Sequence, residues 1–217
     1  MNKLEQHSVT FTQYIERCPI IAILRGITPE EIIPVGRALM ECGINIIEIP
    51  LNSPQPLESI NRLAAEAGDR AIIGAGTVLR VPDVEAVKAA GGQLVVSPNT
   101  DPDVIAATVK AGMISVPGYF TPTEAFAAIY AGAHAIKLFP AEGASPAVVK
   151  AQRAVLPRGL PLFIVGGVQA DDIDKWLSAG ANGFGLGGAL YRPGQSAQQV
   201  GDTASEFIAA LRRQHHT

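Results

Sequence analysis

A single lysine lies within an apolar stretch of the sequence, in the run AHAIKLFPAEG (133–143). Of the six lysines in the chain, only Lys137 lies in an apolar run typical of a buried strand, flanked by Ile136, Leu138 and Phe139. The lysines at 88, 110, 150 and 175 lie in segments with helical periodicity and polar neighbours, and Lys3 is near the terminus. Bringing an unpaired ammonium out of water is so costly that the group tends to lose its proton instead. A neutral amine is a nucleophile that can attack a ketone. The segment therefore predicts Schiff-base chemistry at Lys137.

Three further polar residues lie at or just beyond the ends of apolar, β-branched runs: Arg25, Glu48 and Thr77. Burial and the positive charge of Arg25 would both lower the pKa of Lys137 from its ordinary value of about 10.4. Glu48, acting through a water molecule, would be the general base and acid. The alternatives are structural: Glu48 could form a buried ion pair with Lys137 or Arg25, and Thr77 could be a turn residue.

Two glycine-rich sequences follow the last apolar runs, VGGV (165–168) and GLGGA (185–189). Glycine lets the backbone approach a ligand closely, and exposed backbone N–H groups bind anions. Together the two sequences predict a site for a phosphorylated small molecule, although each could also be only a tight turn. The candidate phosphate-binding residues are Gly166, Gly167, Gly187 and Gly188.

The elements that must position these residues alternate strictly between strand and helix. Eight β-branched runs are separated by helix-like segments, at 19–24, 44–51, 71–76, 93–98, 113–118, 134–139, 160–167 and 181–188. Eight such units predict an α/β fold, a closed (β/α)₈ TIM barrel, as one domain over residues 1–217. An extra N-terminal helix is expected over 9–17 and a last helix over 196–213. An open doubly wound sheet is the alternative.

Helix boundaries are marked by repeated signals. Thr28 and Thr121 each begin a Thr-Pro-x-Glu sequence that predicts a capping box, and Ser53-Pro54 and Ser145-Pro146 repeat its first half. Glycine at six positions is expected to adopt the left-handed conformation that ends a helix: 43, 68, 91, 112, 132 and 180. Alternation within the strands puts Lys137 and Glu48 inside the barrel, at the end where catalytic residues of this fold lie.

Composition excludes several classes of protein. The chain of 217 residues is 47% hydrophobic and 17% charged with a net charge of −3, so neither nucleic acid nor an anionic membrane is expected as a partner. No apolar stretch is long enough to span a bilayer or to resemble a signal peptide. Two cysteines, Cys18 and Cys42, form no disulfide framework. We expect a soluble cytoplasmic protein.

The ordered motifs resemble the class I 2-keto-3-deoxy-6-phosphogluconate and 2-dehydro-3-deoxy-6-phosphogalactonate aldolases from Pro19 to Arg192. The resemblance is carried by AILRG, IEIPLNSP, IGAGTVL, PGYFTPTEA, KLFPAE, VGGV and GLGGALYRPGQ. It implies reversible cleavage of a phosphorylated 2-keto-3-deoxy sugar acid to pyruvate and glyceraldehyde 3-phosphate, with no metal or cofactor, by a homotrimer. It also implies that Lys137 forms the Schiff base, that Glu48 transfers protons, that Arg25 and Thr77 bind substrate, and that the four glycines bind phosphate.

Three positions refine the resemblance. Leu51-Asn52-Ser53 stands where the gluconate branch usually has Leu-Arg-Thr, and Val165 where it commonly has threonine, so the galactonate branch is favoured. Gly188 stands where the family often has serine, which leaves only a backbone N–H for the phosphate. The gluconate epimer and 4-hydroxy-2-oxoglutarate are the alternative substrates. A non-catalytic phosphosugar-binding barrel and a sugar-phosphate isomerase or epimerase are the alternative functions.

Overall fold

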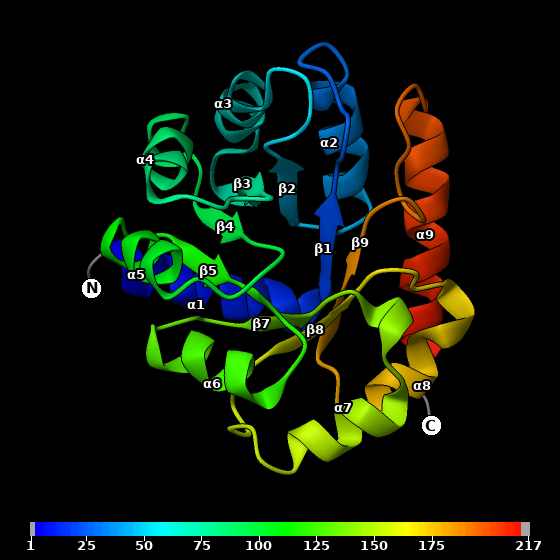
Figure 1. The fold of residues 1–217 in the computed structure, drawn as a ribbon. Coiled ribbons are helices and arrows are strands. Elements are labelled where there is room, and N and C mark those ends of the chain that lie inside the picture. The colour runs from blue at the N-terminus through cyan, green and yellow to red at the C-terminus, as the bar shows by residue number, and fades with distance from the viewer. Residues whose placement is uncertain (1–2, 214–217) are drawn as a thin grey trace.

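The computed structural model describes residues 3–213 and consists of parallel strands surrounded by helices (Figure 1). In the described residues the strands are β1 (Ile20–Ile23), β2 (Ile46–Pro50), β3 (Ile72–Gly76), β4 (Leu94–Val96), β5 (Ile114–Val116), β6 (Gly118–Tyr119), β7 (Ile136–Leu138), β8 (Leu162–Val165) and β9 (Gly183–Leu186). They form one sheet in the order β5-β4-β3-β2-β1-β9-β8-β7-β6.

The helices α2 to α9 form a ring around the strands in chain order, and α9 lies next to α2 (Figure 1). The α-helices are α1 (Lys3–Arg17), α2 (Ile32–Glu41), α3 (Pro56–Ala67), α4 (Val81–Ala89), α5 (Pro102–Lys110), α6 (Pro122–Tyr130), α7 (Pro146–Arg153), α8 (Ile173–Ser178) and α9 (Ala197–Arg213). Short 3₁₀ helices lie at η1 (Gly68–Arg70), η2 (Ala141–Gly143) and η3 (Ala170–Asp172). Among the described helices, none is long and apolar enough to cross a membrane.

The described sheet has nine strands rather than the eight predicted, because Pro117 divides one predicted strand into β5 and β6. Proline has no N–H to contribute to a strand ladder. On the two sides of this break the chain changes partners, since β5 pairs with β4 and β6 pairs with β7. The N–H of Ala135 donates to the carbonyl of Ser115 (3.4 Å), and the N–H of Lys137 donates to that of Pro117 (2.9 Å). The two ends of the sheet are thus joined, and it curves into a near-barrel.

Alternating side chains of the strands separate the apolar core into two regions. Those pointing inward fill the barrel and include Ile21, Ile46, Ile72, Leu94, Ile114, Ala135 and Phe163. Those pointing outward pack against the ring of helices and include Ala22, Ile47, Ile73, Val95, Ile136, Leu138 and Ile164. Because β2 and β7 follow this alternation, Glu48 and Lys137 point into the barrel.

Helix α1 packs against the inside of the barrel, with its side chains joining the inner core. It begins at Lys3, earlier than the predicted start at residue 9. Phe11 is 2% exposed, and its ring lies 6.4 Å from that of Phe163 on β8. The hydroxyl of Tyr14 donates to the carbonyl of Asp69 (2.7 Å), and a ring nitrogen of His7 lies 2.9 Å from the carbonyl oxygen of Gly112. These contacts attach α1 to loops at the N-terminal ends of the strands.

The predicted helix signals are confirmed at some positions and wrong at others. All six glycines expected to end helices have positive φ, and Thr121 and Glu124 form a full capping box. Ser145 also caps its helix, by accepting from the N–H of Val148 (3.4 Å). However, α2 begins only at Ile32, and the Thr28 side chain does not cap it.

The predicted helix start at Ser53-Pro54 is wrong as well. Helix α3 begins at Pro56, after Gln55 in the left-handed conformation. The hydroxyl of Ser53 instead accepts a hydrogen bond from the N–H of Gly26 (3.0 Å), in the loop that follows β1. A tertiary contact between two loops has therefore replaced the local cap that the sequence pattern indicates.

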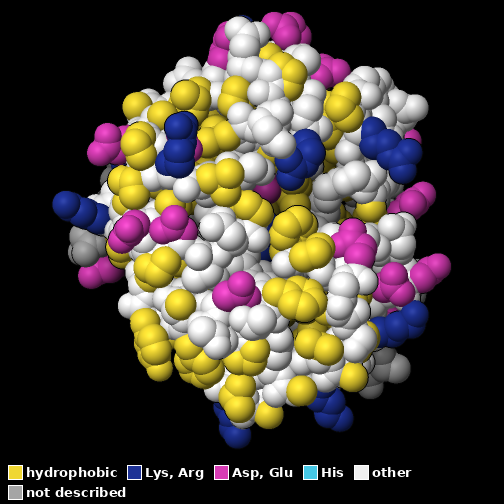
Figure 2. Space-filling model, viewed as in Figure 1, with side chains coloured by type: hydrophobic (Ala, Val, Ile, Leu, Met, Phe, Trp, Pro, Cys, Tyr) yellow, Lys and Arg dark blue, Asp and Glu magenta, His cyan; other side chains and the backbone are white. Residues whose placement is uncertain are grey.

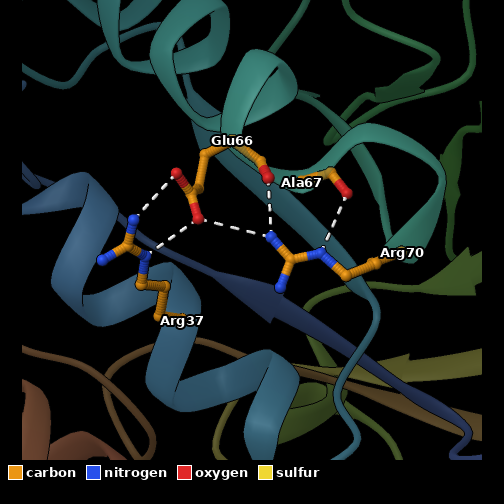
Figure 3. Close-up of polar contacts among 4 residues, drawn as sticks. All are labelled: Arg37, Glu66, Ala67 and Arg70. Carbon is orange, nitrogen blue, oxygen red and sulfur yellow. Dashed lines mark hydrogen bonds and ion pairs between the residues drawn. The ribbon is translucent and has the colours of Figure 1, made fainter.

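Exposed charges also connect neighbouring helices. Glu66 on α3 accepts hydrogen bonds from Arg37 on α2 (2.8 and 3.0 Å) and from Arg70 in η1 (3.3 Å), and Arg70 also donates to the carbonyls of Glu66 and Ala67 (Figure 3). Hydrogen bonding to Arg37 lowers the pKa of Glu66. Such exposed pairs contribute little to stability. On the face in Figure 2 the basic and acidic side chains are interspersed, as expected for a net charge of −3.

We predict that Phe11→Ala lowers the free energy of unfolding by about 3–5 kcal/mol, because it leaves a cavity in the inner core. Urea unfolding followed by circular dichroism measures the change. Gln13→Ala, on the exposed side of the same helix, is the control and should have little effect. Equal stability of the two variants would contradict the packing of α1 into the inner core.

Candidate active site

Two buried ionisable side chains enter the barrel from strands on opposite sides of it. Glu48 lies on β2 and is 2% exposed, and Lys137 lies on β7 and is 6% exposed. Strands β1, β9 and β8 lie between β2 and β7 in the sheet order. Both residues are near the C-terminal ends of their strands, where this type of fold places its catalytic groups.

Space for the Glu48 carboxylate is created by glycines on the neighbouring strand β3. Glu48 is opposite Gly74, and a Cβ atom on Gly76 would collide with the carboxylate. The Oε2 atom of Glu48 is buried without a hydrogen-bond partner. Burial raises the pKa of Glu48 to about 7, although Lys137 and Arg25 act to lower it. A carboxyl with this pKa can both accept and release a proton near neutral pH.

Lys137 is in an environment that disfavours its charged form. Burial lowers its pKa to about 8; the negative charge of Glu48 acts to raise it and the positive charge of Arg25 to lower it further. The Nζ atom lies 5.1 Å from the centre of the Phe139 ring, which accounts for part of the apolar surroundings. At pH 7 a lysine with a pKa near 8 is neutral in about one molecule in ten, against about one in a few thousand for an ordinary lysine.

The alternative in which Glu48 forms a buried ion pair with Lys137 or Arg25 is not observed among the described residues. Among the described residues, none of the ion pairs includes Lys137, Glu48 or Arg25. Glu48 and Lys137 influence each other's pKa, and the charge of Arg25 lowers both pKa values, although none of these residues forms an ion pair with another. This arrangement leaves the lysine nitrogen available to another molecule.

Arg25 follows β1 and is held by a residue whose role the sequence did not indicate. Its guanidinium donates a hydrogen bond to the side-chain oxygen of Asn52 (2.7 Å), in the loop after β2. The hydroxyl of the next residue, Ser53, accepts a hydrogen bond from the N–H of Gly26 (3.0 Å). The loops after β1 and β2 are therefore locked together. In the sequence Asn52 is only a marker of one family branch, because its contact with Arg25 depends on the fold.

Thr77 directly follows β3 and has a left-handed backbone with φ of 55°. This conformation is uncommon for a residue with a branched Cβ, and such strain is concentrated at functional sites. Its side chain is half-buried. The structure thus places Thr77 at the same end of the barrel as Glu48, one residue beyond the glycine that makes room for the carboxylate.

The two glycine loops leave neighbouring strands at the same level. Strands β8 and β9 pair with Val165 opposite Gly185, so Gly166-Gly167 and Gly187-Gly188 lie side by side just beyond them. Gly166 and Gly167 have φ of 109° and 65°, in the region that favours glycine. A Cβ on Gly188 would meet nothing within 4 Å, so this position borders open space.

The arrangement suits nucleophilic attack on a ketone. A lysine with a lowered pKa, a carboxyl with a raised pKa and an arginine lie at one end of the barrel, beside backbone loops that can receive an anion. Within residues 3–213 there is no group of three or more His, Cys, Asp or Glu side chains that could hold a metal ion.

Comparison with known proteins gives consistent results. The sequence model of the family described as "KDPG and KHG aldolase" matches residues 11–204. The chain is 46% identical to the 2-dehydro-3-deoxy-6-phosphogalactonate aldolase of Escherichia coli K12, over 92% of this chain and 98% of that protein. It is 30% identical to the 2-dehydro-3-deoxy-phosphogluconate aldolase of Treponema pallidum, over 87% and 89%. A solved structure described as "Native KDPGal structure" superimposes with a TM-score of 0.91 and 45% identity, covering 93% of this chain and 98% of that chain.

We predict opposite shifts in the pKa of Lys137 when its two charged neighbours are removed. Glu48→Gln should lower this pKa, because the negative charge that raises it is lost, and Arg25→Met should raise it. The ¹³C chemical shift of the lysine ε-carbon, followed against pH in labelled protein, measures both. Glu85→Gln removes an exposed carboxylate of α4 and is the control. Shifts of the same sign in the two variants would refute the shared electrostatic environment.

Proposed function

This chain belongs to the KDPG and KHG aldolase family and is an aldolase, and we propose that it reversibly cleaves 2-dehydro-3-deoxy-6-phosphogalactonate to pyruvate and glyceraldehyde 3-phosphate. The observation that carries the chemistry is the buried lysine, whose pKa is lowered to about 8 and which forms no ion pair with the nearby carboxylate, among the described residues. Such a lysine serves a class I mechanism, in which the enzyme and the substrate are joined by a Schiff base.

The first half of the reaction joins Lys137 to the substrate. The neutral Nζ attacks the C2 ketone, and the resulting carbinolamine loses water to give a protonated iminium. Glu48, through a water molecule, supplies and removes the protons of these steps. Its pKa of about 7 suits both directions of transfer. Arg25, fixed by Asn52, binds the anionic substrate together with Thr77.

The second half of the reaction breaks the bond between C3 and C4. Glu48 accepts the proton of the C4 hydroxyl, the electrons of the C3–C4 bond move to the iminium nitrogen, and glyceraldehyde 3-phosphate leaves. The enamine that remains takes a proton at C3, and water then releases pyruvate and restores the free amine. The 6-phosphate is held by the backbone N–H groups of the two glycine loops, Gly166-Gly167 and Gly187-Gly188.

The galactonate epimer is favoured over the gluconate epimer by two independent observations. Identity is 46% to the galactonate-specific relative and 30% to the gluconate-specific relative. Asn52 contacts Arg25 directly, at a loop position where the gluconate branch usually carries arginine. A second arginine there would place a positive charge beside Arg25 and change the loop that faces the substrate.

We also propose how the chain is organised. Counting β5 and β6 as one strand interrupted at Pro117 gives eight β/α units, so the chain is one (β/α)₈ barrel domain. A homotrimer is proposed because apolar side chains are exposed near the starts of α3 and α4, namely Leu57, Leu79 and Val81. Exposed apolar side chains of this size are available to an interface between subunits. The cytoplasm is the proposed location, as for other enzymes of sugar-acid metabolism.

Trapping experiments test the covalent step. We predict that pyruvate and borohydride together attach a reduced pyruvyl group irreversibly to Lys137, seen as a mass increase on the peptide that contains it. Lys137→Met should prevent labelling and abolish turnover, while Lys150→Met, on the exposed surface of α7, should change neither. Turnover should persist in excess EDTA. A wild-type protein that stays unlabelled while a known class I aldolase is labelled would refute the mechanism.

Kinetics on the two C4 epimers test the substrate. We predict a higher kcat/KM for the 6-phosphogalactonate derivative than for the 6-phosphogluconate derivative. Release of pyruvate, coupled to lactate dehydrogenase, measures both rates. The reverse order would assign the chain to the gluconate branch and would leave the Schiff-base mechanism intact. A product other than pyruvate would instead favour an isomerase or epimerase.

A further inference from the structure

A carboxylate lies over one of the two glycine loops. Glu142 belongs to η2, just after β7, and its exposed side chain rests on Gly166 and Gly167. A Cβ atom on Gly166 would collide with the Oε2 atom of Glu142, and one on Gly167 would lie 2.7 Å from its Cγ. The carboxylate therefore occupies the space directly above the backbone that is proposed to receive a phosphate.

The negative charge of Glu142 is not neutralised by a partner. In the part of the chain that the structure describes, none of the ion pairs includes Glu142. A pocket of about 300 Å³ beside the loop is lined by Glu142 together with Asp172 and Lys175, but the ammonium of Lys175 donates to Asp172 (3.1 Å). The available cation of this pocket is thus already bound to another carboxylate.

The second glycine loop carries the opposite charge. The Nε atom of Arg192 donates to the carbonyl of Gly188 (3.2 Å), which fixes an exposed guanidinium against that loop. The two loops leave adjacent strands at the same level. A phosphate between them would therefore meet a positive side chain on one side and a negative side chain on the other.

We propose that Glu142 is a specificity-determining residue that weakens the binding of phosphorylated substrates. It thereby lowers the ratio of kcat/KM for phosphorylated 2-keto-3-deoxy acids to kcat/KM for unphosphorylated ones. This inference rests on the proposed function, in which the glycine loops bind the 6-phosphate. A phosphate monoester carries a charge near −2 at neutral pH, and like charges at short range repel. Because its side chain is exposed, Glu142 can turn away when the phosphate enters, and that movement accompanies each binding event.

The test is the neutral, nearly isosteric variant Glu142→Gln. We expect the KM for the phosphorylated acid to fall about fivefold with kcat unchanged. A change of this size is expected when one repulsive contact between exposed like charges is removed. The kcat/KM for the unphosphorylated acid should stay the same. The difference between the wild type and the variant should shrink as salt is added, because salt screens the repulsion. If Glu142 had a purely structural role, the variant would change kcat/KM for both substrates to the same extent.

Asp171→Asn is the matched control. It removes one negative charge from an exposed residue of η3 that does not line the pocket, and it should leave both KM values unchanged. An unchanged or raised KM for the phosphorylated acid in Glu142→Gln would overturn the proposal, as would an equal fall in Asp171→Asn.

Binding of inorganic phosphate, measured by calorimetry, separates this proposal from the proposed function. Tighter binding to Glu142→Gln than to the wild type and Asp171→Asn supports the role of Glu142 even if turnover is absent. Equal affinity for all three overturns that role, while the borohydride experiment on Lys137 independently decides the aldolase mechanism.

Discussion

The cost of burying charge is the constraint on which the site depends. A barrel closed by packed aliphatic side chains disfavours an ammonium and a carboxylate alike. Burial therefore lowers the pKa of Lys137 to about 8 and raises that of Glu48 to about 7, so both values lie near neutral pH. Direct contact would cancel this effect by stabilising the charged forms of both groups. Their entry from opposite sides of the barrel keeps them electrostatically coupled without an ion pair, and the glycines of β3 provide the room that this separation requires.

Much of the fold could be predicted from the sequence because its signals are local. The alternating runs locate the strands, glycine marks the helix ends, and Lys137 stands out as the one lysine within an apolar run typical of a strand. Tertiary contacts explain what could not be predicted. The hydroxyl of Ser53 bonds to Gly26 instead of capping a helix, and Pro117 separates two strands because of where its neighbours find partners.

The same limit applies to the site. The sequence indicates Glu48 and Lys137 through strand alternation, but the need for glycine at position 76 and the contact between Asn52 and Arg25 appear only when separate strands meet. Glu142 is another example. In the sequence it is an ordinary acidic residue after a buried strand, and only the packing of η2 against the loop after β8 brings its side chain over the glycines that are proposed to bind an anion.

Side chains of helix α1 pack into the inner core at the N-terminal end of the barrel. Because Phe11 packs on Phe163 and the described inner core is filled below the site, we expect molecules to approach Lys137 from the C-terminal ends of the strands. In the proposed mechanism both products then leave by this end, and the one attached to the lysine lies deeper. In that mechanism the aldehyde departs before pyruvate, and in the direction of synthesis pyruvate enters first. The seal at one end of the barrel thus imposes a temporal order on the ligands.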